Sequence, residues 1–90
     1  MSVQTLTFGT SDSCDVIVRD EYVSPKHMMA TYHEEGHLLF VVDLVSTNGT
    51  WILTSSMYGL GIRVSPTRPQ QVFRGQAIRI GRTIIPYGIL

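Results

Sequence analysis

Residues 27–44 read HMMATYHEEGHLLFVVDL, and two apolar runs in this stretch flank a short polar segment. The first run, residues 27–33, alternates with the two-residue period of a half-buried β-strand. Residues 34–37 (EEGH) predict a hairpin turn in which Gly36 supplies a positive φ. Residues 38–44 then predict the returning strand. The centre of the chain is therefore predicted to be an antiparallel β-hairpin.

Further short strand patterns lie on both sides of this hairpin. They cover residues 3–8, 16–18, 50–53, 61–64, 77–80 and 83–87. Turn-forming residues separate them, and the last two are predicted to form a hairpin that turns at Gly81-Arg82. Residues 54–61 are predicted to be a loop. Residues 65–71 hold two prolines and are predicted not to form a central strand.

Composition agrees with an all-β fold. The chain has 9 Val, 8 Ile and 9 Thr, whose branched side chains suit a pleated sheet. The helix formers are scarce, with 2 Ala, 3 Glu, 1 Lys and 7 Leu. No convincing helix and no internal repeat is found. Short, mostly antiparallel strands with frequent turns predict a sandwich or barrel with essentially no helix.

Length and charge restrict the class of protein. Ninety residues suit one domain, predicted over residues 1–90. Lys and Arg total 7 and Asp and Glu total 7, so no basic excess points to nucleic acid. A single cysteine, Cys14, excludes an intramolecular disulfide, and no apolar run is long enough to span a bilayer. No signal peptide is visible, so we predict a soluble cytoplasmic domain.

The sequence offers no convincing catalytic or metal site. Ser24, His27 and Asp43 can be combined into a hydrolytic triad, but the strand–elbow–helix context that exposes a nucleophile is missing. His33 and His37 flank a hairpin turn, where the helical spacing of metal ligands does not apply. We therefore predict no enzyme activity, no metal and no cofactor.

Two polar loops stand out at the ends of predicted strands. Residues 24–27 (SPKH) lie directly before a strand, and residues 46–50 (STNGT) lie directly after one. Loops on a rigid scaffold commonly carry functional groups. Each loop alone is also explained by local turn chemistry, since Ser, Thr and Asn side chains bond readily to their own backbone.

Taken together, these loops and their context resemble the forkhead-associated (FHA) domain. The segments that carry the resemblance are residues 8–10 (FGT), 14–18 (CDVIV), 23–27 (VSPKH), 43–52 (DLVSTNGTWI) and 75–81 (GQAIRIG). They follow the family's order at compatible spacings, from about residue 8 onward. The resemblance implies a β-sandwich whose loops at one end bind phosphothreonine peptides without catalysis.

The resemblance also implies roles for individual residues. Ser24 is expected to donate its hydroxyl to a phosphate oxygen, with Thr47 beside it in the same pocket. Asn48 is expected to hold the main chain of the ligand through its amide. The residues expected to shape the loops are Gly9, His27 and Gly49. Asp43 and Trp51 are interpreted as architectural.

The chain departs from the family pattern at the phosphate pocket. The family's phosphate-gripping Arg is expected after Gly9, where this chain has Thr10. Gly81-Arg82 lies in the closing hairpin and is interpreted as a false match to it. Pro25 follows the motif Ser and has neither an N–H nor a side-chain donor. Lys26 and the Thr10 hydroxyl are the candidates that could compensate, so a weakened phosphate grip is predicted.

A second departure lies at the N-terminal edge. The family has an additional strand before the first one predicted here, so an unpaired strand edge is expected. A second copy of the chain or a partner segment is expected to cover it.

Two functions are kept from these patterns. The first is a phosphothreonine-dependent signalling adaptor that rests on Ser24, Thr47 and Asn48. The second is a degenerate FHA fold that serves phosphate-independent assembly or a structural role, and it rests on Thr10, Pro25 and the short N-terminal segment before Gly9. Neither function implies contact with nucleic acid or a membrane.

Overall fold

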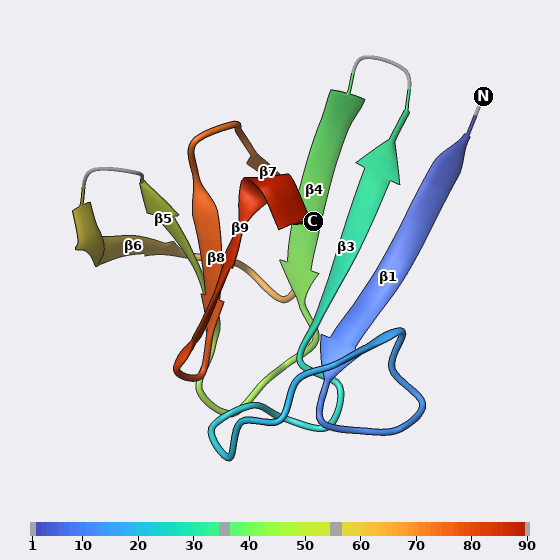
Figure 1. Ribbon diagram of the computed structural model, residues 1–90, viewed down its shortest axis with the longest axis vertical. Coiled ribbons are helices and arrows are strands. Elements are labelled where there is room, and N and C mark those ends of the chain that lie inside the picture. Colours follow the sequence, from blue (N-terminus) through green and yellow to red (C-terminus); the bar gives the residue numbers. More distant parts are fainter. Residues whose placement is uncertain (1, 35–36, 55–56, 90) are drawn as a thin grey trace.

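The computed structural model of the protein describes residues 2–34, 37–54 and 57–89. In this part of the chain, two β-sheets face each other (Figure 1). The five-stranded sheet has the order β2-β1-β3-β4-β7, and the four-stranded sheet has the order β6-β5-β8-β9. The elements are β1 (Val3–Gly9), β2 (Val16–Ile17), β3 (Met28–His33), β4 (Leu38–Asp43), β5 (Thr50–Thr54), β6 (Met57–Arg63), β7 (Gln70–Val72), β8 (Ala77–Ile80), β9 (Thr83–Pro86) and the 3₁₀ helix η2 (Tyr87–Ile89).

The predicted central hairpin is confirmed. Strands β3 and β4 pair antiparallel from Met28 opposite Asp43 to His33 opposite Leu38. The predicted positive φ at Gly36 lies outside the described residues, and within them His37 takes a φ of 52°. All strand pairs are antiparallel except β1 with β2, which pair in parallel over two residues. The prediction of an all-β sandwich of short, mostly antiparallel strands is therefore confirmed.

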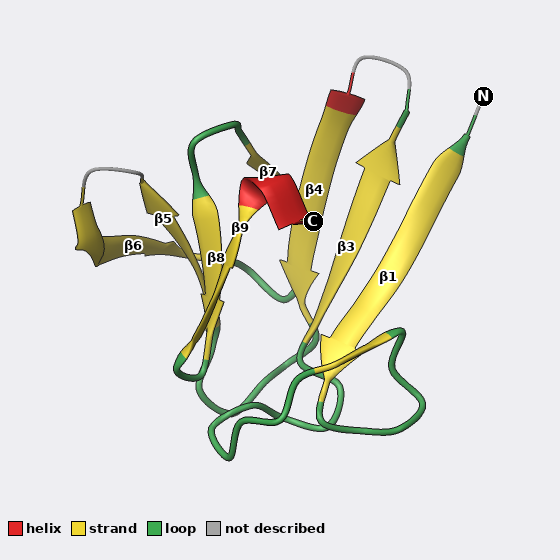
Figure 2. Cartoon of the chain, viewed as in Figure 1, coloured by secondary structure: helices red, strands yellow, loops and turns green. Residues whose placement is uncertain are grey.

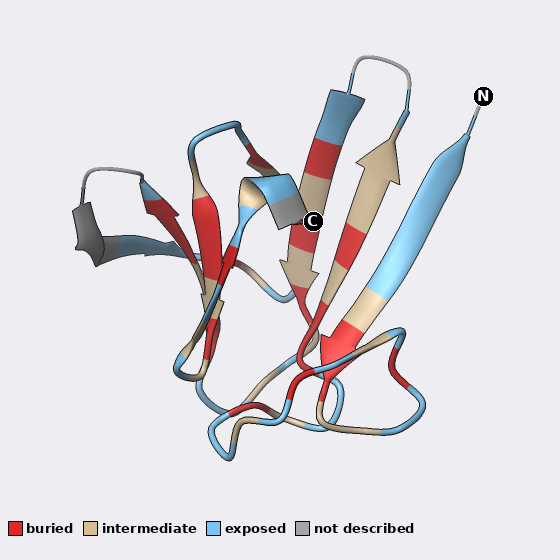
Figure 3. Cartoon of the chain, viewed as in Figure 1, coloured by how far each residue is buried: buried red, intermediate tan, exposed pale blue. Residues whose placement is uncertain are grey.

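The core lies between the two sheets, where the buried positions of Figure 3 face one another. Alternation places it there: in β4, Leu39 and Val41 are buried while Phe40 and Val42 are half-buried on the outer face. The buried core cluster consists of Phe8, Val18, Val23, Met28, Ala30, Leu39, Val41, Ile52, Val64, Val72, Ile78, Ile80 and Ile85. Both sheets contribute to it, so neither sheet buries its apolar face alone.

The prediction of a loop over residues 54–61 was wrong for residue 54 and for residues 57–61, while residues 55–56 lie outside the described part of the chain. Strand β6 begins at Met57 and pairs with β5, with a register shift between Leu53 and Thr54. Glycines in this stretch indicated a loop, but Gly61 serves a close approach of two strands. A Cβ atom there would lie 3.1 Å from Leu53 Cδ2, which is tighter than ordinary packing. The pairing of residues 61–63 with β5 was predicted and is confirmed.

The N-terminal strand has a largely open edge. Strand β1 pairs with β3 along six residues, but on its other side β2 reaches only Phe8 and Gly9. The Thr7 N–H donates to Asp15 Oδ2 at 2.9 Å instead of to a strand. Among the described residues, no strand therefore covers the outer edge of β1 from Val3 to Leu6. The apolar side chains of Val3 and Leu6 are exposed.

Four connections gather at one end of the sandwich (Figure 2). They are the β1–β2, β2–β3 and β4–β5 loops and the turn of the β8–β9 hairpin. Hydrogen bonds across large sequence distances tie them together, including Arg82 N–H to Asp20 Oδ2 at 2.7 Å. This end holds both polar loops that the sequence singled out.

Candidate functional site

The two polar loops meet at Ser24. The Thr47 N–H donates to Ser24 Oγ at 3.0 Å, which joins the β4–β5 loop to the β2–β3 loop. The Thr10 N–H donates to the Ser24 carbonyl at 3.2 Å, which adds the β1–β2 loop. Residues 10, 24 and 47 are thus brought together from three separate loops.

The bond from Thr47 leaves the Ser24 hydroxyl able to donate. A hydroxyl has one donor hydrogen and two acceptor lone pairs. Because Ser24 Oγ accepts from the Thr47 N–H, its hydrogen remains available for an outside acceptor. Ser24 is half-buried and Thr47 is exposed.

His27 lies beneath this pair and is fully buried, with 0% of its surface exposed. Its Nδ1 accepts the Ser24 N–H at 3.0 Å. Its Nε2 lies 2.8 Å from the Gly49 carbonyl, which can only accept, so the proton is assigned to Nε2. The ring therefore connects the backbones of the β2–β3 and β4–β5 loops.

Two glycines allow the loops to come this close. A Cβ atom at Gly9 would overlap the Pro25 carbonyl, so any larger residue would separate the β1–β2 loop from residues 24 and 25. Gly49 has a φ of 88°, a conformation that residues with a side chain rarely adopt.

Asp43 holds the β4–β5 turn in shape. Its carboxylate is 4% exposed and accepts the Ser46 hydroxyl at 2.6 Å and the Thr50 hydroxyl at 2.7 Å. The Ser46 N–H adds a third bond at 2.9 Å. Burial raises the pKa of Asp43, but the hydrogen bonds from Ser46 and Thr50 outweigh burial and hold the pKa below its ordinary value.

Asn48 already has an internal partner. Its Nδ2 donates to the Tyr22 carbonyl at 2.9 Å, so the amide supports the β2–β3 loop. An Asn side chain has two N–H donors and an acceptor oxygen. One N–H and Oδ1 therefore remain for a ligand, since no other side-chain bond of Asn48 is seen within the described ranges.

The side chains of Lys26 and Thr10 are not held at the site by hydrogen bonds with described residues. The Lys26 side chain is exposed and makes no hydrogen bond with any described residue. Thr10 is half-buried, and its backbone, not its hydroxyl, contacts Ser24. Hydrogen bonds of Ser24, His27 and Thr47 thus join the β2–β3 and β4–β5 loops, whereas the Lys26 side chain takes no part in this network of described residues.

Sequence reasoning missed the contribution of the closing hairpin. Arg82 stacks on Tyr22, with Cζ 4.5 Å from the ring centroid, and its Nη2 donates to the Tyr22 hydroxyl at 3.0 Å. Tyr22 is the residue that Asn48 holds. The contact of the hairpin with the β2–β3 loop was not predicted, because Asp20 and Arg82 are 62 residues apart and no local sequence pattern connects them.

Asp20 is the anchor between that hairpin and the β2–β3 loop. Its carboxylate accepts N–H groups from Tyr22 and Arg82 and the hydroxyl of Thr83, at 2.7–2.9 Å. The bond from the Tyr22 N–H is the main cause that lowers the pKa of Asp20, and the bonds from Arg82 and Thr83 act in the same direction.

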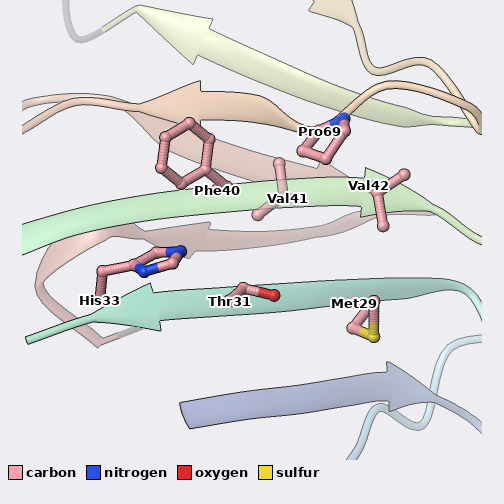
Figure 4. Close-up of a pocket in the computed structure, with 7 residues that line it drawn as sticks. All are labelled: Met29, Thr31, His33, Phe40, Val41, Val42 and Pro69. Carbon is pink, nitrogen blue, oxygen red and sulfur yellow. The ribbon is translucent and has the colours of Figure 1, made fainter. Parts of the chain in front are cut away.

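Other parts of the described chain offer less polar chemistry. An apolar hollow lies on the outer face of β3 and β4, lined by Met29, Thr31, His33, Phe40, Val41, Val42 and Pro69 (Figure 4). Its few polar groups do not converge on one point. Within residues 2–34, 37–54 and 57–89, no three His, Cys, Asp or Glu side chains cluster closely enough to hold a metal. No helix in these ranges is long and apolar enough to cross a membrane.

Comparison with known proteins agrees with the fold. Residues 6–81 match the model of the FHA domain family. The FHA domain-containing protein PS1 of Arabidopsis thaliana is 30% identical over 78 residues, which cover 87% of this chain. The chain spans 5% of the length of that relative.

Solved structures resemble the whole sandwich. The N-terminal FHA domain of Saccharomyces cerevisiae Rad53p, in complex with a phosphothreonine peptide, is 30% identical with a TM-score of 0.68, covering 90% of this chain and 60% of that one. The FHA domain of an Arabidopsis thaliana hypothetical protein has a TM-score of 0.72 at 19% identity, covering 94% of this chain and 67% of that one. At 19% identity, the similarity to this second structure supports only the fold.

Proposed function

The chain belongs to the FHA domain family, and from this premise we propose that it is a non-catalytic adaptor that binds phosphothreonine peptides. FHA domains bind phosphothreonine peptides as interaction modules. Structural neighbours include FHA domains in complex with phosphopeptides and with partner proteins. The ligand proposed for this chain is accordingly a phosphothreonine in a protein or peptide.

One observation carries the proposal: Ser24 Oγ is held in place by the neighbouring loops before any ligand arrives. The Thr47 N–H occupies a lone pair of Ser24 Oγ, and the His27 ring fixes the Ser24 backbone. A phosphothreonine carries about −1.5 to −2 charges and three acceptor oxygens, so it requires several converging donors. Ser24 and Thr47 supply hydroxyl donors at little entropic cost because their loops are already joined.

The phosphate grip proposed here is weaker than that of an FHA domain with Arg after the first Gly. Thr10 offers one hydroxyl where Arg would offer a charged fork. Pro25 removes the N–H that the neighbouring backbone position would otherwise present. Lys26 is exposed, lies two residues after Ser24 in the sequence, and is proposed to supply positive charge to the pocket.

Around this pocket, Gly9, His27 and Gly49 are proposed to shape the loops, and Asn48 to hold the ligand main chain. The buried His27 ring and the close contact at Gly9 support the first role. The remaining N–H and Oδ1 of Asn48 support the second.

A second candidate function is phosphate-independent assembly by a degenerate FHA fold. The open outer edge of β1 favours it, because unpaired backbone groups of an edge strand accept another strand. We include a homodimer or a partner strand at this edge in the proposal. It does not require Ser24, so the two functions are separable by mutation.

The cellular setting is also a proposal. The shared core of both sheets supports one domain over residues 1–90. The cytoplasm is proposed as the compartment of this domain. The balance of 7 basic and 7 acidic residues supports a protein ligand rather than nucleic acid or an anionic membrane.

The test is binding to three immobilised peptide libraries that are identical except for a central phosphothreonine, phosphoserine or threonine. We expect retention on the phosphothreonine library and about tenfold less with Ser24→Ala, since a hydrogen bond to a charged group contributes ~1.5–3 kcal/mol. Ser2→Ala, at the other end of the sandwich, is the matched control. Equal retention on all three libraries, unaffected by Ser24→Ala, would support the second function instead.

A further inference from the structure

The open edge of β1 presents a short row of unpaired backbone groups. The carbonyls of Ser2 and Phe8 accept N–H groups from the two residues that flank β3, at 3.1 and 2.8 Å, so the even-numbered residues of this segment direct their backbone groups toward β3. Backbone groups alternate in direction along a strand. The odd-numbered residues Val3 and Thr5 therefore direct their N–H and carbonyl groups outward, where no described strand meets them (Figure 1).

A carboxylate ends this row on the side of β2. The Thr7 N–H donates to Asp15 Oδ2 at 2.9 Å, and the Thr7 hydroxyl donates to the same oxygen at 3.1 Å. Thr7 is the next odd-numbered residue after Thr5, so its N–H is not available to another strand. Within the described part of β1, the outward donors that remain are the N–H groups of Val3 and Thr5.

This edge lacks the features that usually keep strand edges apart. Exposed edges are commonly blocked by charged side chains, by proline or by the shortness of the strand. Residues 2–8 (SVQTLTF) contain no charge and no proline. By contrast, the edge strand β7 has three residues and follows Pro69, and the edge strand β9 ends in Pro86. Val3 is 57% exposed and Leu6 is 38% exposed, so the edge of β1 also has apolar surface to bury.

A second copy of the chain satisfies both of these residues at once. When two β1 strands run antiparallel with Gln4 opposite Gln4, Val3 of each copy lies opposite Thr5 of the other. Each of these two pairs exchanges two N–H···O=C bonds, so the contact has four. Moving the centre to Thr5 would place Val3 opposite Thr7, whose N–H already bonds to Asp15. Among residues 3–7, the register centred on Gln4 therefore uses every free outward donor.

The side chains in this register also suit a symmetric contact. A two-fold axis brings the same surface of both copies together, so a charged residue near it would face its own sign. Residues 2–8 carry no charge that could repel the second copy. The Gln4 amides offer both donors and an acceptor, so the two copies of Gln4 are able to bond to each other. A contact this short is expected to form a weak dimer that exchanges with the monomer.

We propose that a second copy of this chain occupies the open edge of β1 in the register centred on Gln4, and that the resulting dimer is a two-ended adaptor. The pairing deepens the assembly proposed above by naming its partner and register, and the two-ended role rests on the proposed phosphothreonine function. Gly9, where the β1–β2 loop begins, is five residues from Gln4. The two copies of Gly9 therefore lie about 33 Å apart, at a rise of ~3.3 Å per residue. The two phosphate pockets lie at opposite ends of the joined sheet and hold two separate phosphorylated chains.

Cysteine cross-linking tests the register without any ligand. The Cα atoms of a non-hydrogen-bonded antiparallel pair lie ~4.5 Å apart, a distance that a disulfide spans. Under mild oxidation, Gln4→Cys should form about tenfold more covalent dimer than Leu6→Cys, whose Cα atoms lie roughly 13 Å apart in this register. The parent chain should form none, because Cys14 is buried. Stronger cross-linking of Thr5→Cys than of Gln4→Cys would show that the register is wrong, and no cross-linking above the parent would overturn the pairing itself.

A proline at residue 5 removes an outward donor without breaking a bond to β3. Thr5→Pro loses the N–H that faces the open edge, whereas Thr5→Ala keeps it, so the two variants form a matched pair. In sedimentation equilibrium, Thr5→Ala should dimerise like the parent, and Thr5→Pro should require a concentration about tenfold higher or more. Thermal unfolding first establishes that both variants are folded, and Gln4→Cys tests the pairing independently. Equal dimerisation of the two folded variants would overturn the pairing.

A bridging assay tests the two-ended role. Beads that carry a phosphothreonine peptide are loaded with the chain and then offered a fluorescent phosphothreonine peptide in solution. The cross-linked Gln4→Cys dimer should retain about tenfold more fluorescent peptide than Thr5→Pro, although both bind the beads. Binding to the beads without bridging would overturn the two-ended role and leave the phosphothreonine function standing. If neither protein binds the beads, the phosphothreonine function and the two-ended role both fail, and cross-linking alone decides the strand pairing.

Discussion

At the scale of single residues, the hydroxyl of Ser24 is the most informative group. Its oxygen accepts the Thr47 N–H, so its hydrogen remains available to an outside acceptor. The neighbouring positions contribute little to phosphate binding, because Thr10 has no charge and Pro25 has no N–H donor. The pocket is therefore expected to be correctly shaped and short of positive charge.

Thr10→Arg tests whether charge is what the pocket lacks. The new guanidinium should bond to the phosphate, and a charge-assisted bond of ~1.5–3 kcal/mol corresponds to a gain of about tenfold or more in phosphothreonine affinity. Calorimetric titration measures the gain, and Thr5→Arg adds the same charge on the outer part of β1 as a control. An unchanged affinity would show that the loops no longer form a phosphate pocket.

Residue-level reasoning from the sequence reached the central part of this site but not its surroundings. The Ser-x-x-His and Ser-Thr-Asn-Gly-Thr motifs placed Ser24, Thr47 and Asn48 in loops at strand ends, and the resemblance to FHA domains implied that these loops share one pocket. Arg82 was assigned to a remote hairpin. Its contact with Tyr22 depends on how the second sheet closes over the first, and no local pattern records that.

At the scale of elements, the turn between β4 and β5 depends on one carboxylate. Asp43 bonds to Ser46 and Thr50, and the Ser46 hydroxyl in turn accepts the Gly49 N–H at 2.9 Å. This chain of bonds fixes the loop that carries Thr47 and Asn48.

The Asp43 carboxylate should make the free energy of unfolding depend on pH in the acidic range. Since the folded pKa of Asp43 is below its unfolded value of about 3.9, its contribution is complete above about pH 5 and is lost as the pH falls through the folded pKa. Urea unfolding between pH 7 and pH 2.5 measures this. Asp43→Asn should lower the free energy of unfolding at pH 7 by about 1–3 kcal/mol and flatten the dependence on pH. If Asp43→Asn is as stable as the parent at pH 7, the Asp43 carboxylate does not stabilise the fold in this way.

Gly9→Ala tests the close approach of the β1–β2 loop. The added methyl group meets the backbone of Pro25, which cannot move without displacing Ser24. Overpacking of this kind costs ~1–3 kcal/mol, and phosphothreonine affinity should fall with stability. Gly88→Ala is the control, because a Cβ atom there has nothing within 4 Å. Equal unfolding midpoints for both variants would contradict the close contact.

The elements differ in how well sequence predicted them. Alternation of side chains predicted β3 and β4 because both bury one face. The first residues of β6 were missed because residues 54–61 were predicted to be a loop, whereas Gly61 fits beneath Leu53 and Trp51 in a paired strand. The parallel pairing of β1 with β2 involves two residues and leaves no periodic pattern.

At the scale of the whole molecule, the sandwich combines a polar end with an open side edge. Light scattering across a hundredfold range of concentration tests whether that edge pairs with a second copy. We expect the average mass to rise with concentration and Leu6→Lys to abolish the rise, because a charge at an edge strand opposes strand pairing. Thr54→Lys serves as a control, and a strict monomer at every concentration would exclude self-pairing.

The central claim is that the joined loops of residues 10, 24 and 47 hold a phosphothreonine. The most direct measurement is a calorimetric titration of the unmodified chain with one library-selected peptide in its phosphothreonine and threonine forms. We predict saturable binding of the phosphothreonine form, at least tenfold weaker binding of the threonine form, and loss of that difference in Ser24→Ala. Equal affinity for the two forms, or a difference that persists in Ser24→Ala, would contradict the claim.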